Sequence, residues 1–383
     1  MTSGEDVDAR TQLQSALRRC LERSDGPRPY LVGESGTSEP FDRKLWHVLT
    51  AEIGVTGLLV PEDLGGAGAT FADAALVAEE LGRAIAPVPF LSTVALATVA
   101  LLESRGEPPA RGLLTRLTNP DATATLAWCS TEGGAEAGSA GVRAIDGEGG
   151  WRLSGAAGFV VDGAGADVVL VAADIGATLG LFAVEATTAG VLAAPMQTLD
   201  LLRPLATMTF DDAEAELVAQ DAESALVTAK DCAVVLLAAE QVGGARRCLD
   251  EAVAYAKQRV QFDRPIGSFQ AIKHKLVDAL LDVEMARSAA AVAVRAADAY
   301  LRDPTGEHRN NLTLMASLAK STCAEAYLRT AEETLHVHGG IGFTWEHDAH
   351  LHFRRAKAGE LYLGSPDDHR DRLASYAGLA RHG

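Results

Sequence analysis

Apolar residues recur at helical spacing through the first third of the chain. The i, i+3, i+4, i+7, i+8 spacing of an amphipathic helix is followed by Leu13, Ala16, Leu17, Cys20 and Leu21. The same spacing returns over residues 41–53 and 70–81, where Thr70 can act as the N-cap. Residues 87–102 are almost wholly apolar, but an internal proline and three hydroxyl residues favour a buried helix over a membrane span. Residues 1–120 therefore predict an N-terminal α-helical domain.

From residue 122 the apolar period changes from helical to alternating. Six short runs are separated by glycine and aspartate: ATLAWCS, WRLSG, GFVVDG, ADVVLVAA, GLFAVE and ATMTFDD. Short apolar or alternating runs at this spacing are typical of an all-β domain. Residues 121–213 therefore predict a middle β-sandwich or barrel.

Long helical patterns follow the segment FDDAEAE. Residues 225–259, 269–302 and 310–338 carry alanine-rich faces and almost no internal glycine or proline. A last helical stretch is expected over residues 350–379. Helices of this length pack against one another as an antiparallel bundle, so residues 214–383 predict a C-terminal helical bundle. The fold class is α+β and multidomain.

Composition narrows the possible partners and the compartment. The chain has 48% hydrophobic and 22% charged residues, as ordinary globular proteins do, and a net charge of −18. No basic block offsets this charge, which argues against nucleic acid and anionic membranes as partners. The five cysteines are dispersed without a C-x-x-C pair, which argues against a zinc site and a disulfide framework. Without a signal-peptide pattern at the N-terminus, a cytoplasmic protein without membrane insertion is expected.

Four motifs carry a resemblance to a known family. RVQFDRPIGSFQ (259–270) and LHVHGGIGFTWEH (335–347) each follow a long helix, and VPEDLGGAG (60–68) and AWCSTE (127–132) precede them. In this order, the chain resembles the acyl-CoA dehydrogenase family over essentially its whole length. The resemblance implies an N-terminal helical domain, a middle β domain and a C-terminal four-helix bundle, packed as a dimer or a dimer of dimers around FAD. It also implies α,β-dehydrogenation of an acyl-CoA thioester, in which a carboxylate removes the α proton and the flavin accepts the β hydride.

The catalytic base of this family has no counterpart at its usual positions. The aromatic-Glu-Gly-Thr segment of relatives aligns with residues 362–365, which places Leu363 where the glutamate belongs. A second location in the family, ahead of AAEQVGG, falls on Ala233 and Val234. Leucine and alanine cannot accept a proton. The remaining, weaker candidate carboxylates are Glu360, Asp367, Asp368 and Asp231, and for each of them a solvated carboxylate on a helix surface is the favoured interpretation.

The segment that relatives extend across the dimer interface is present. Arg259 and Phe262 match the R-x-x-F pattern, and Gln270 matches the glutamine that follows it. The resemblance implies that they contact the FAD of the neighbouring chain, where a guanidinium can donate two charge-assisted hydrogen bonds to phosphate. The alternative for Arg259 is a cation that stabilises the C-terminus of its own helix.

A double glycine is also present, at Gly339 and Gly340. In relatives the absence of a Cβ here allows the backbone to approach the cofactor closely. His336 stands where many relatives have glutamine and can still donate one hydrogen bond. The alternative for the pair is a helix end with a left-handed cap.

The half of the site that a chain contributes to its own flavin matches less well. Thr131 and Glu132 are present, but Gly133 replaces the usual proline. The Trp-Ile-Thr that packs on the flavin ring in relatives is replaced by residues 159–161, Phe-Val-Val, which carry no hydroxyl. Ala157 stands where a lysine is common. The contacts to a neighbour's flavin are therefore present, whereas those to the chain's own flavin are partly lost.

Three functions fit this asymmetry. The first is the base-lacking subunit of a two-chain acyl-CoA dehydrogenase, similar to the actinobacterial heterotetramers that act on bulky sterol or polyketide-like CoA thioesters. The second is an autonomous homo-oligomer that uses a displaced carboxylate, Glu360 or Asp367. The third is a flavin-dependent oxidase or monooxygenase on the same fold. The identity of the acyl group and the choice between CoA and a carrier protein stay open.

Overall fold

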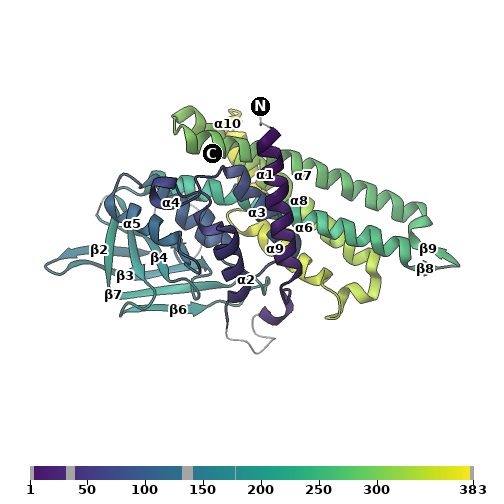
Figure 1. Cartoon of the computed structure of the whole chain (residues 1–383), viewed down its shortest axis with the longest axis horizontal. Coiled ribbons are helices and arrows are strands. Elements are labelled where there is room, and N and C mark those ends of the chain that lie inside the picture. Colours follow the sequence, from purple (N-terminus) through teal and green to yellow (C-terminus); the bar gives the residue numbers. More distant parts are fainter. Residues whose placement is uncertain (1–3, 32–38, 132–140, 177, 380–383) are drawn as a thin grey trace. The chain divides into compact units, whose positions relative to one another are not determined.

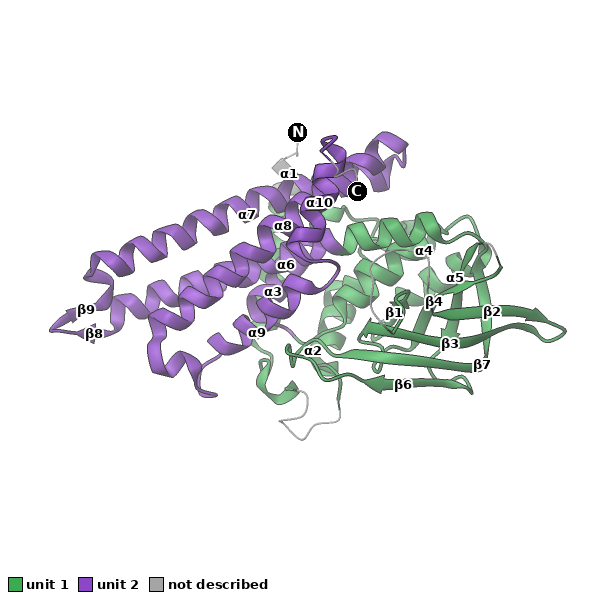
Figure 2. Ribbon diagram, turned by 180° about the vertical axis from the view of Figure 1, so that it is seen from behind, with its two compact units in different colours: residues 1–74, 87–233 green, residues 75–86, 234–383 purple. Residues whose placement is uncertain are grey.

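The computed structural model describes residues 4–31, 39–131, 141–176 and 178–379. The chain divides into two compact units, coloured separately in Figure 2. Unit 1 comprises Met1–Ala74 and Pro87–Ala233, and unit 2 comprises Ala75–Ala86 and Val234–Gly383. Among the described residues, no helix is long and apolar enough to cross a membrane.

The N-terminal part of the chain is helical, as its apolar spacing predicts. Its helices are α1 (Gly4–Glu22), α2 (Arg43–Val48), α3 (Phe71–Ala84), α4 (Val99–Glu103) and α5 (Pro108–Leu117). The apolar segment forms a π-helical stretch, Leu91–Thr98, that is buried at every residue and continues into α4. At the start of α3, the side chain of Asp73 in the first turn accepts hydrogen bonds from the residue that precedes the helix. The N–H and Oγ1 of Thr70 donate to the Asp73 carboxylate at 2.9 and 2.6 Å.

The β domain is a single seven-stranded sheet that closes on itself. Its strands are β1 (Ala124–Ala127), β2 (Val142–Gly147), β3 (Gly150–Val161), β4 (Val168–Asp174), β5 (Leu179–Glu185), β6 (Val191–Pro195) and β7 (Leu205–Ala219). The order β1-β4-β2-β3-β7-β5 is closed by a further β4–β5 pairing, and β6 lies beside β7. The ring encloses a core that includes Leu153, Val171, Phe182 and Met208, all fully buried. Of the two expected architectures, the strand pairing is that of a barrel.

Two details of the expected strand pattern are wrong. WRLSG and GFVVDG are parts of one strand, β3, in which register shifts against β7 take the place of a turn. Gly155 (φ 133°) and Phe159 (φ 55°) have positive φ next to these shifts, as β-bulges allow. β7 also continues through FDDAEAE to Ala219, so the strand extends beyond residue 213.

Three long helices have limits that agree with the apolar pattern, and all of their residues except those of the first helix up to Ala233 belong to unit 2. They are α6 (Glu223–Gln258), α7 (Gln270–Arg302) and α8 (Gly306–His338), followed by α9 (Ala349–Leu361) and α10 (Pro366–Tyr376). A short hairpin of β8 (Val260–Gln261) and β9 (Arg264–Pro265) joins α6 to α7 at one end of the bundle (Figure 1). The expected continuous stretch over 350–379 is broken at residues 362–365. Ser365 and Asp368 form a capping box there, and Pro366 occupies the first turn of α10.

Glycines in α3 and α6 allow close packing of neighbouring elements. A Cβ added at Gly243 would lie 1.8 Å from the carbonyl oxygen of Glu79 in α3, and one at Gly82 would lie 2.1 Å from that of Glu240. A Cβ at Gly244 would lie 2.4 Å from the ring of Tyr327 in α8. Helix backbones therefore approach each other here more closely than any larger residue would allow.

Candidate functional site

The turn at residues 362–365 keeps a defined conformation although it carries no carboxylate at residue 363. Leu363 has φ 63° and is 6% exposed, and Gly364 follows with φ 101°. A left-handed conformation costs a leucine roughly 1–2 kcal/mol, so surrounding contacts must hold it. Nε2 of the buried His369 donates to the Leu363 carbonyl at 3.0 Å, and its Nδ1 lies 3.2 Å from Oγ of Ser317 in α8. In the neutral ring, Nδ1 therefore accepts from the serine hydroxyl.

The end of α9, just before this turn, is held by side chains from two other helices. The ammonium group of Lys320, a fully buried residue of α8, donates to the carbonyls of Gly359 and Glu360 at 2.7 and 2.9 Å. The amide of Gln241 in α6 donates to the Gly359 carbonyl at 3.2 Å. The last carbonyls of a helix have no partner within the helix, so these donors satisfy them. The backbone that leads into the 362–365 turn is therefore held in place by hydrogen bonds from α6 and α8.

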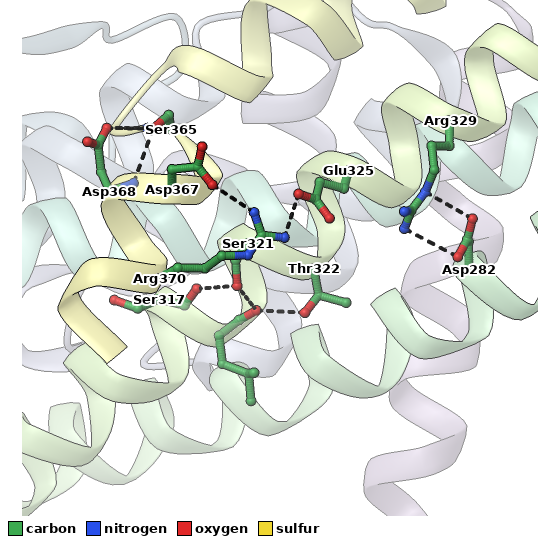
Figure 3. A network of polar contacts seen from close by, with 11 residues as sticks. Asp282, Ser317, Ser321, Thr322, Glu325, Arg329, Ser365, Asp367, Asp368 and Arg370 are labelled. Carbon is green, nitrogen blue, oxygen red and sulfur yellow. Dashed lines mark hydrogen bonds and ion pairs between the residues drawn. The ribbon is translucent and has the colours of Figure 1, made fainter. Parts of the chain in front are cut away.

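The candidate carboxylates near the turn have other contacts. Glu360 lies 2.6 Å from the Lys357 ammonium group. The carboxylate of Asp367 is 90% exposed and lies 3.0 Å from Arg370, which also contacts Glu325 in α8 (Figure 3).

Two further carboxylates were candidates. Asp368 accepts hydrogen bonds from the N–H and hydroxyl of Ser365, both at 2.8 Å, within the capping box. Asp231 lies in the part of α6 that belongs to unit 1 and is 2% exposed. Ala233, at the second family position, is fully buried in the same helix.

The β8–β9 arm, residues 259–265, is an exposed hairpin. Ile266 N–H donates to the Arg259 carbonyl at 2.8 Å and closes its base. Phe262 (φ 53°) and Asp263 (φ 60°) form the tip, with both positive φ values that a type I′ turn requires. The Phe262 side chain is 86% exposed and meets only an edge of Phe269, whose ring centroid is 6.0 Å away.

Other exposed polar groups lie beside the tip of the arm. Arg264 places its guanidinium 4.0 Å from the centroid of the Phe269 ring, which is a cation–π contact. Arg259 is exposed, and Gln270 lies at the start of α7 with its amide 2.7 Å from His274. The arm therefore presents an aromatic ring and two guanidinium groups outside its own bundle.

The double glycine ends α8 beside a stack of aromatic rings. Gly339 has φ 62° and ψ −139°, a conformation that requires glycine, and a Cβ added at Gly340 would meet no atom within 4 Å. Preceding it, His338 packs between Tyr255 and His347, each with its ring centroid 4.4 Å away, and burial lowers the pKa of His338. The side chain of His336 is 60% exposed. Gly340 is therefore not explained by packing within the described part of this chain, and open backbone here fits a close external ligand.

In unit 1 the structure brings together the residues expected to contact the chain's own flavin. The N–H of Gly158 donates to the Cys129 carbonyl at 3.0 Å, and a Cβ added at Gly158 would lie 2.9 Å from Cα of Thr131. Thr131 is exposed and Phe159 is 39% exposed. Because Phe159 follows Gly158 in the chain and Gly158 packs against Thr131, the two residues reach the surface close together. Val160 and Val161 are buried at 2% and 1%. Ala157 is buried as well, and Glu132 and Gly133 lie outside the described residues.

Sequence reasoning missed the buried residues that hold the 362–365 turn. These are Gln241, Ser317, Lys320 and His369. One signal was available for Lys320, because it lies at helical spacing from Ala316, Cys323 and Ala324, on a face that is otherwise apolar. A charged residue on such a face usually has a buried partner.

Comparison with known proteins identifies the family. The model of the acyl-CoA dehydrogenase N-terminal domain matches residues 8–110, and that of the C-terminal domain matches residues 233–377. The chain belongs to the acyl-CoA dehydrogenase family, whose members are oxidoreductases that act on acyl-CoA and use FAD.

The chain is similar both to curated proteins and to solved structures of the family. The acyl-CoA dehydrogenase IpdE2 of Mycobacterium tuberculosis is 36% identical over 378 residues, which cover 96% of this chain and 97% of that protein. The ChsE4-ChsE5 complex of Mycobacterium tuberculosis is 28% identical with a TM-score of 0.81, and the match covers 100% of this chain and 99% of that one. A chain of the Tcur3481-Tcur3483 steroid acyl-CoA dehydrogenase gives the same identity and TM-score over 97% of this chain and 98% of its own.

Proposed function

We propose that this chain is the base-lacking subunit of a heteromeric acyl-CoA dehydrogenase, which acts on a CoA thioester together with a second chain of the same family. One observation carries the proposal: the 362–365 turn is held in place by His369, while its residue 363 is a buried leucine. The carboxylate that removes the α proton would come from the second chain. The ChsE4-ChsE5 complex, a structure of two named chains with this fold, supports such an arrangement.

The chemistry explains why a missing base matters. Bound FAD supplies hydride acceptance, and a positioned general base typically contributes about 10²–10⁴-fold to proton removal. Leu363 cannot take that role, and the contacts of Glu360 with Lys357 and of Asp367 with Arg370 keep these carboxylates engaged elsewhere. A homo-oligomer that works without a second kind of chain and uses Glu360 or Asp367 as its base is therefore the less well supported function.

The residues that would hold FAD fall into two groups. Arg259, Phe262 and Gln270 on and beside the β8–β9 arm, with His336 and the open backbone of Gly339 and Gly340, would contact the flavin of the neighbouring chain. A guanidinium is suited to the diphosphate because it can donate two charge-assisted hydrogen bonds. In unit 1, Thr131 and Phe159 are the counterparts that remain for the chain's own flavin. The steroid acyl-CoA dehydrogenase among the relatives supports a bulky lipid acyl group.

The proposal is tested by visible absorption of the purified chain, first alone and then co-expressed with a neighbouring acyl-CoA dehydrogenase gene. We expect no stoichiometric flavin band from the chain alone and a stoichiometric band from the pair. In the pair, Arg259→Ala should lower flavin occupancy, whereas Arg302→Ala, an exposed arginine at the other end of α7, should not.

Activity of the pair separates the two readings of the base. Glu360→Gln and Asp367→Asn should each leave at least half of the dehydrogenase rate. A chain that alone is yellow and active, and that loses its rate in one of these two variants, would show that the base is its own.

A further inference from the structure

The loop between α8 and α9, residues 339–346, presents its middle outward and is held at its two ends. Its exposed apolar side chains are Ile341, Phe343 and Trp345, at 43%, 66% and 46%. One end follows His338, the last residue of α8, and the other end precedes His347. The rings of these two histidines stack with their centroids 4.4 Å apart. A pair of imidazole rings therefore joins the two ends of the 339–346 loop.

Hydrogen bonds to the backbone fix which nitrogen of each ring carries a proton. Nδ1 of His338 lies 2.8 Å from the carbonyl oxygen of Thr334, which can only accept, so this nitrogen is a donor. Nδ1 of His347 accepts a hydrogen bond from the N–H of Ala349, the first residue of α9, at 3.1 Å. In the neutral ring of His347 the proton is therefore on Nε2. The hydrogen bond from Ala349 exists only while Nδ1 of His347 is unprotonated.

Protonation of His347 would remove a contact that joins the loop to α9. The ring nitrogen and the Ala349 N–H would both become donors, so their hydrogen bond would be lost. The added charge would also lie at the N-terminus of α9, where the helix dipole disfavours a cation. His338 is 5% exposed and burial lowers its pKa, whereas His347 is half-buried. His347 is therefore the ring of this pair that a proton can reach.

Other ionisable groups lie on each element that packs against the two rings. They are Tyr255, Arg247 and Glu251 of α6, His352 of α9, and Glu346 and Asp348 on either side of His347 in the chain. Arg247 and Glu251 pair with each other at 2.6 Å. His352 is buried, and its pKa is lowered to about 3. Because histidine is the side chain that ordinarily titrates near neutral pH, burial of His338 and His352 leaves His347 as the group that changes charge here.

We propose that His347 is a positioning residue that holds the 339–346 loop at the start of α9 while it is neutral and releases the loop when it is protonated. The role of His347 in the loop does not depend on the proposed function. Its consequence for the cofactor does, because the loop contains Gly340, whose open backbone is there assigned to flavin. If that assignment holds, protonation of His347 weakens the retention of flavin.

Hydrogen–deuterium exchange of the full-length chain tests the role of His347. Exchange in peptides spanning residues 339–350 is expressed relative to the intrinsic rate at each pH. We expect wild-type exchange to be at least about threefold faster at about pH 5.5 than at about pH 7.5, because an ordinary histidine is mostly protonated at the lower value. In His347→Asn this ratio should be close to unity, since asparagine Oδ1 can accept from the Ala349 N–H and does not titrate. Circular dichroism of each variant checks that it folds.

A second variant removes the acceptor, and a control changes a distant histidine. His347→Phe keeps an aromatic ring beside His338, but it cannot accept from Ala349. Its loop should exchange at least about threefold faster than that of the wild type at the higher pH, as expected for one lost hydrogen bond. His308→Asn is the matched control, because His308 contacts the Asp303 carbonyl at the other end of α8. This control should keep the wild-type ratio, and His352 is present in every chain compared.

Any of four results would overturn the proposal. The first is a wild-type ratio close to unity, and the second is a pH response that persists in His347→Asn. The third is a His347→Phe loop that exchanges as slowly as the wild-type loop at the higher pH. The fourth is a His308→Asn chain that loses the pH response, which would place the response outside the loop.

Flavin retention by the co-expressed pair separates this proposal from the proposed function. If both hold, the wild-type pair loses flavin on dialysis at the lower pH, and the His347→Asn pair retains more of it. If the pair contains no flavin at either pH while the exchange results are as expected, the proposed function fails and the role of His347 in the loop stands. If the pair retains flavin equally at both pH values while exchange of the loop changes, the consequence for the cofactor is overturned.

Discussion

The 362–365 turn and the β8–β9 arm both hold L-residues at positive φ, but in opposite surroundings. Leu363 (φ 63°) is 6% exposed, and its carbonyl accepts a hydrogen bond from His369. Phe262 (φ 53°) is 86% exposed at the tip of its hairpin. In the turn, internal contacts maintain a conformation that carries a leucine and no carboxylate at residue 363. In the arm, an unfavourable conformation serves to present a side chain outward. Changes in the turn region should therefore affect stability, and changes in the arm should affect binding.

The largest effect is expected for Lys320→Met, which removes the buried ammonium group but keeps most of the side-chain volume. Its two charge-assisted hydrogen bonds to the Gly359 and Glu360 carbonyls are lost, and such bonds contribute about 1.5–3 kcal/mol each; the Gly359 carbonyl keeps the Gln241 amide as a donor, whereas the Glu360 carbonyl loses the ammonium group. We expect the free energy of unfolding in urea to fall by roughly 3 kcal/mol. Lys357→Met, at a lysine that is 45% exposed, is the control and should change it by less than about 1 kcal/mol. Equal effects of both variants would show that the end of α9 does not depend on Lys320.

A smaller, pH-dependent effect is expected from His352 in α9, whose Nδ1 lies 2.8 Å from the hydroxyl of Tyr327. Burial, with several nearby cations, lowers the pKa of His352 to about 3. The unfolded chain protonates this histidine near pH 6.5 and the folded chain does not, so the stability contribution is present above pH 6.5 and is lost as pH falls toward 3.

Between neutral pH and pH 5 this histidine alone should cost roughly 2 kcal/mol of the free energy of unfolding. His352→Gln should flatten the pH dependence by that amount, as measured by urea unfolding at several pH values. A wild-type slope that survives in His352→Gln would mean that His352 is protonated in the folded chain.

The sequence predicted the long helices well because their signal is local and repeated. The expected helix over 269–302 corresponds to α7 (Gln270–Arg302), since apolar spacing without internal proline persists over many turns. The strand β6 gave no comparable signal, because three of its five residues are exposed and its pairing with β7 comes from a distant part of the chain. The break at 362–365 did have a signal in Gly-Ser-Pro-Asp-Asp, which combines a C-terminal glycine with a helix N-cap.

The candidate site was predictable where it depends on motifs and not where it depends on long-range contacts. The positions of Leu363, Arg259 and Gly339 follow from local patterns, and each lies in a turn, a hairpin or a helix end. The contact between His369 and Ser317 joins residues 52 apart in sequence, and that of Lys320 with the Gly359 carbonyl joins residues 39 apart. A single sequence does not identify such pairs: the position of Lys320 on an apolar face indicates that it has a buried partner, but neither residue type nor spacing says which residue that is.

The smallest effect on stability, and the sharpest test of the comparison, is expected for Phe262→Asn. Asparagine adopts positive φ more readily than phenylalanine and is favoured at this position of a type I′ turn, which offsets the lost edge contact with Phe269. We expect the free energy of unfolding of the chain to change by no more than about 0.5 kcal/mol. Flavin occupancy of the co-expressed pair should nevertheless fall, because the aromatic side chain is absent from the tip.

A loss of stability without a loss of flavin would contradict the view that the arm serves binding and the turn serves stability. If Phe262→Asn destabilises the chain by about 2 kcal/mol and leaves flavin occupancy unchanged, Phe262 is part of the bundle's own packing. Gln261→Asn, one residue earlier in the same hairpin, separates the two cases because its backbone does not require positive φ and its amide contacts only the Val260 carbonyl. A loss of flavin in Phe262→Asn alone, with both variants as stable as the wild type, would mean that the strained backbone at the tip is maintained for the ring that it presents to another chain.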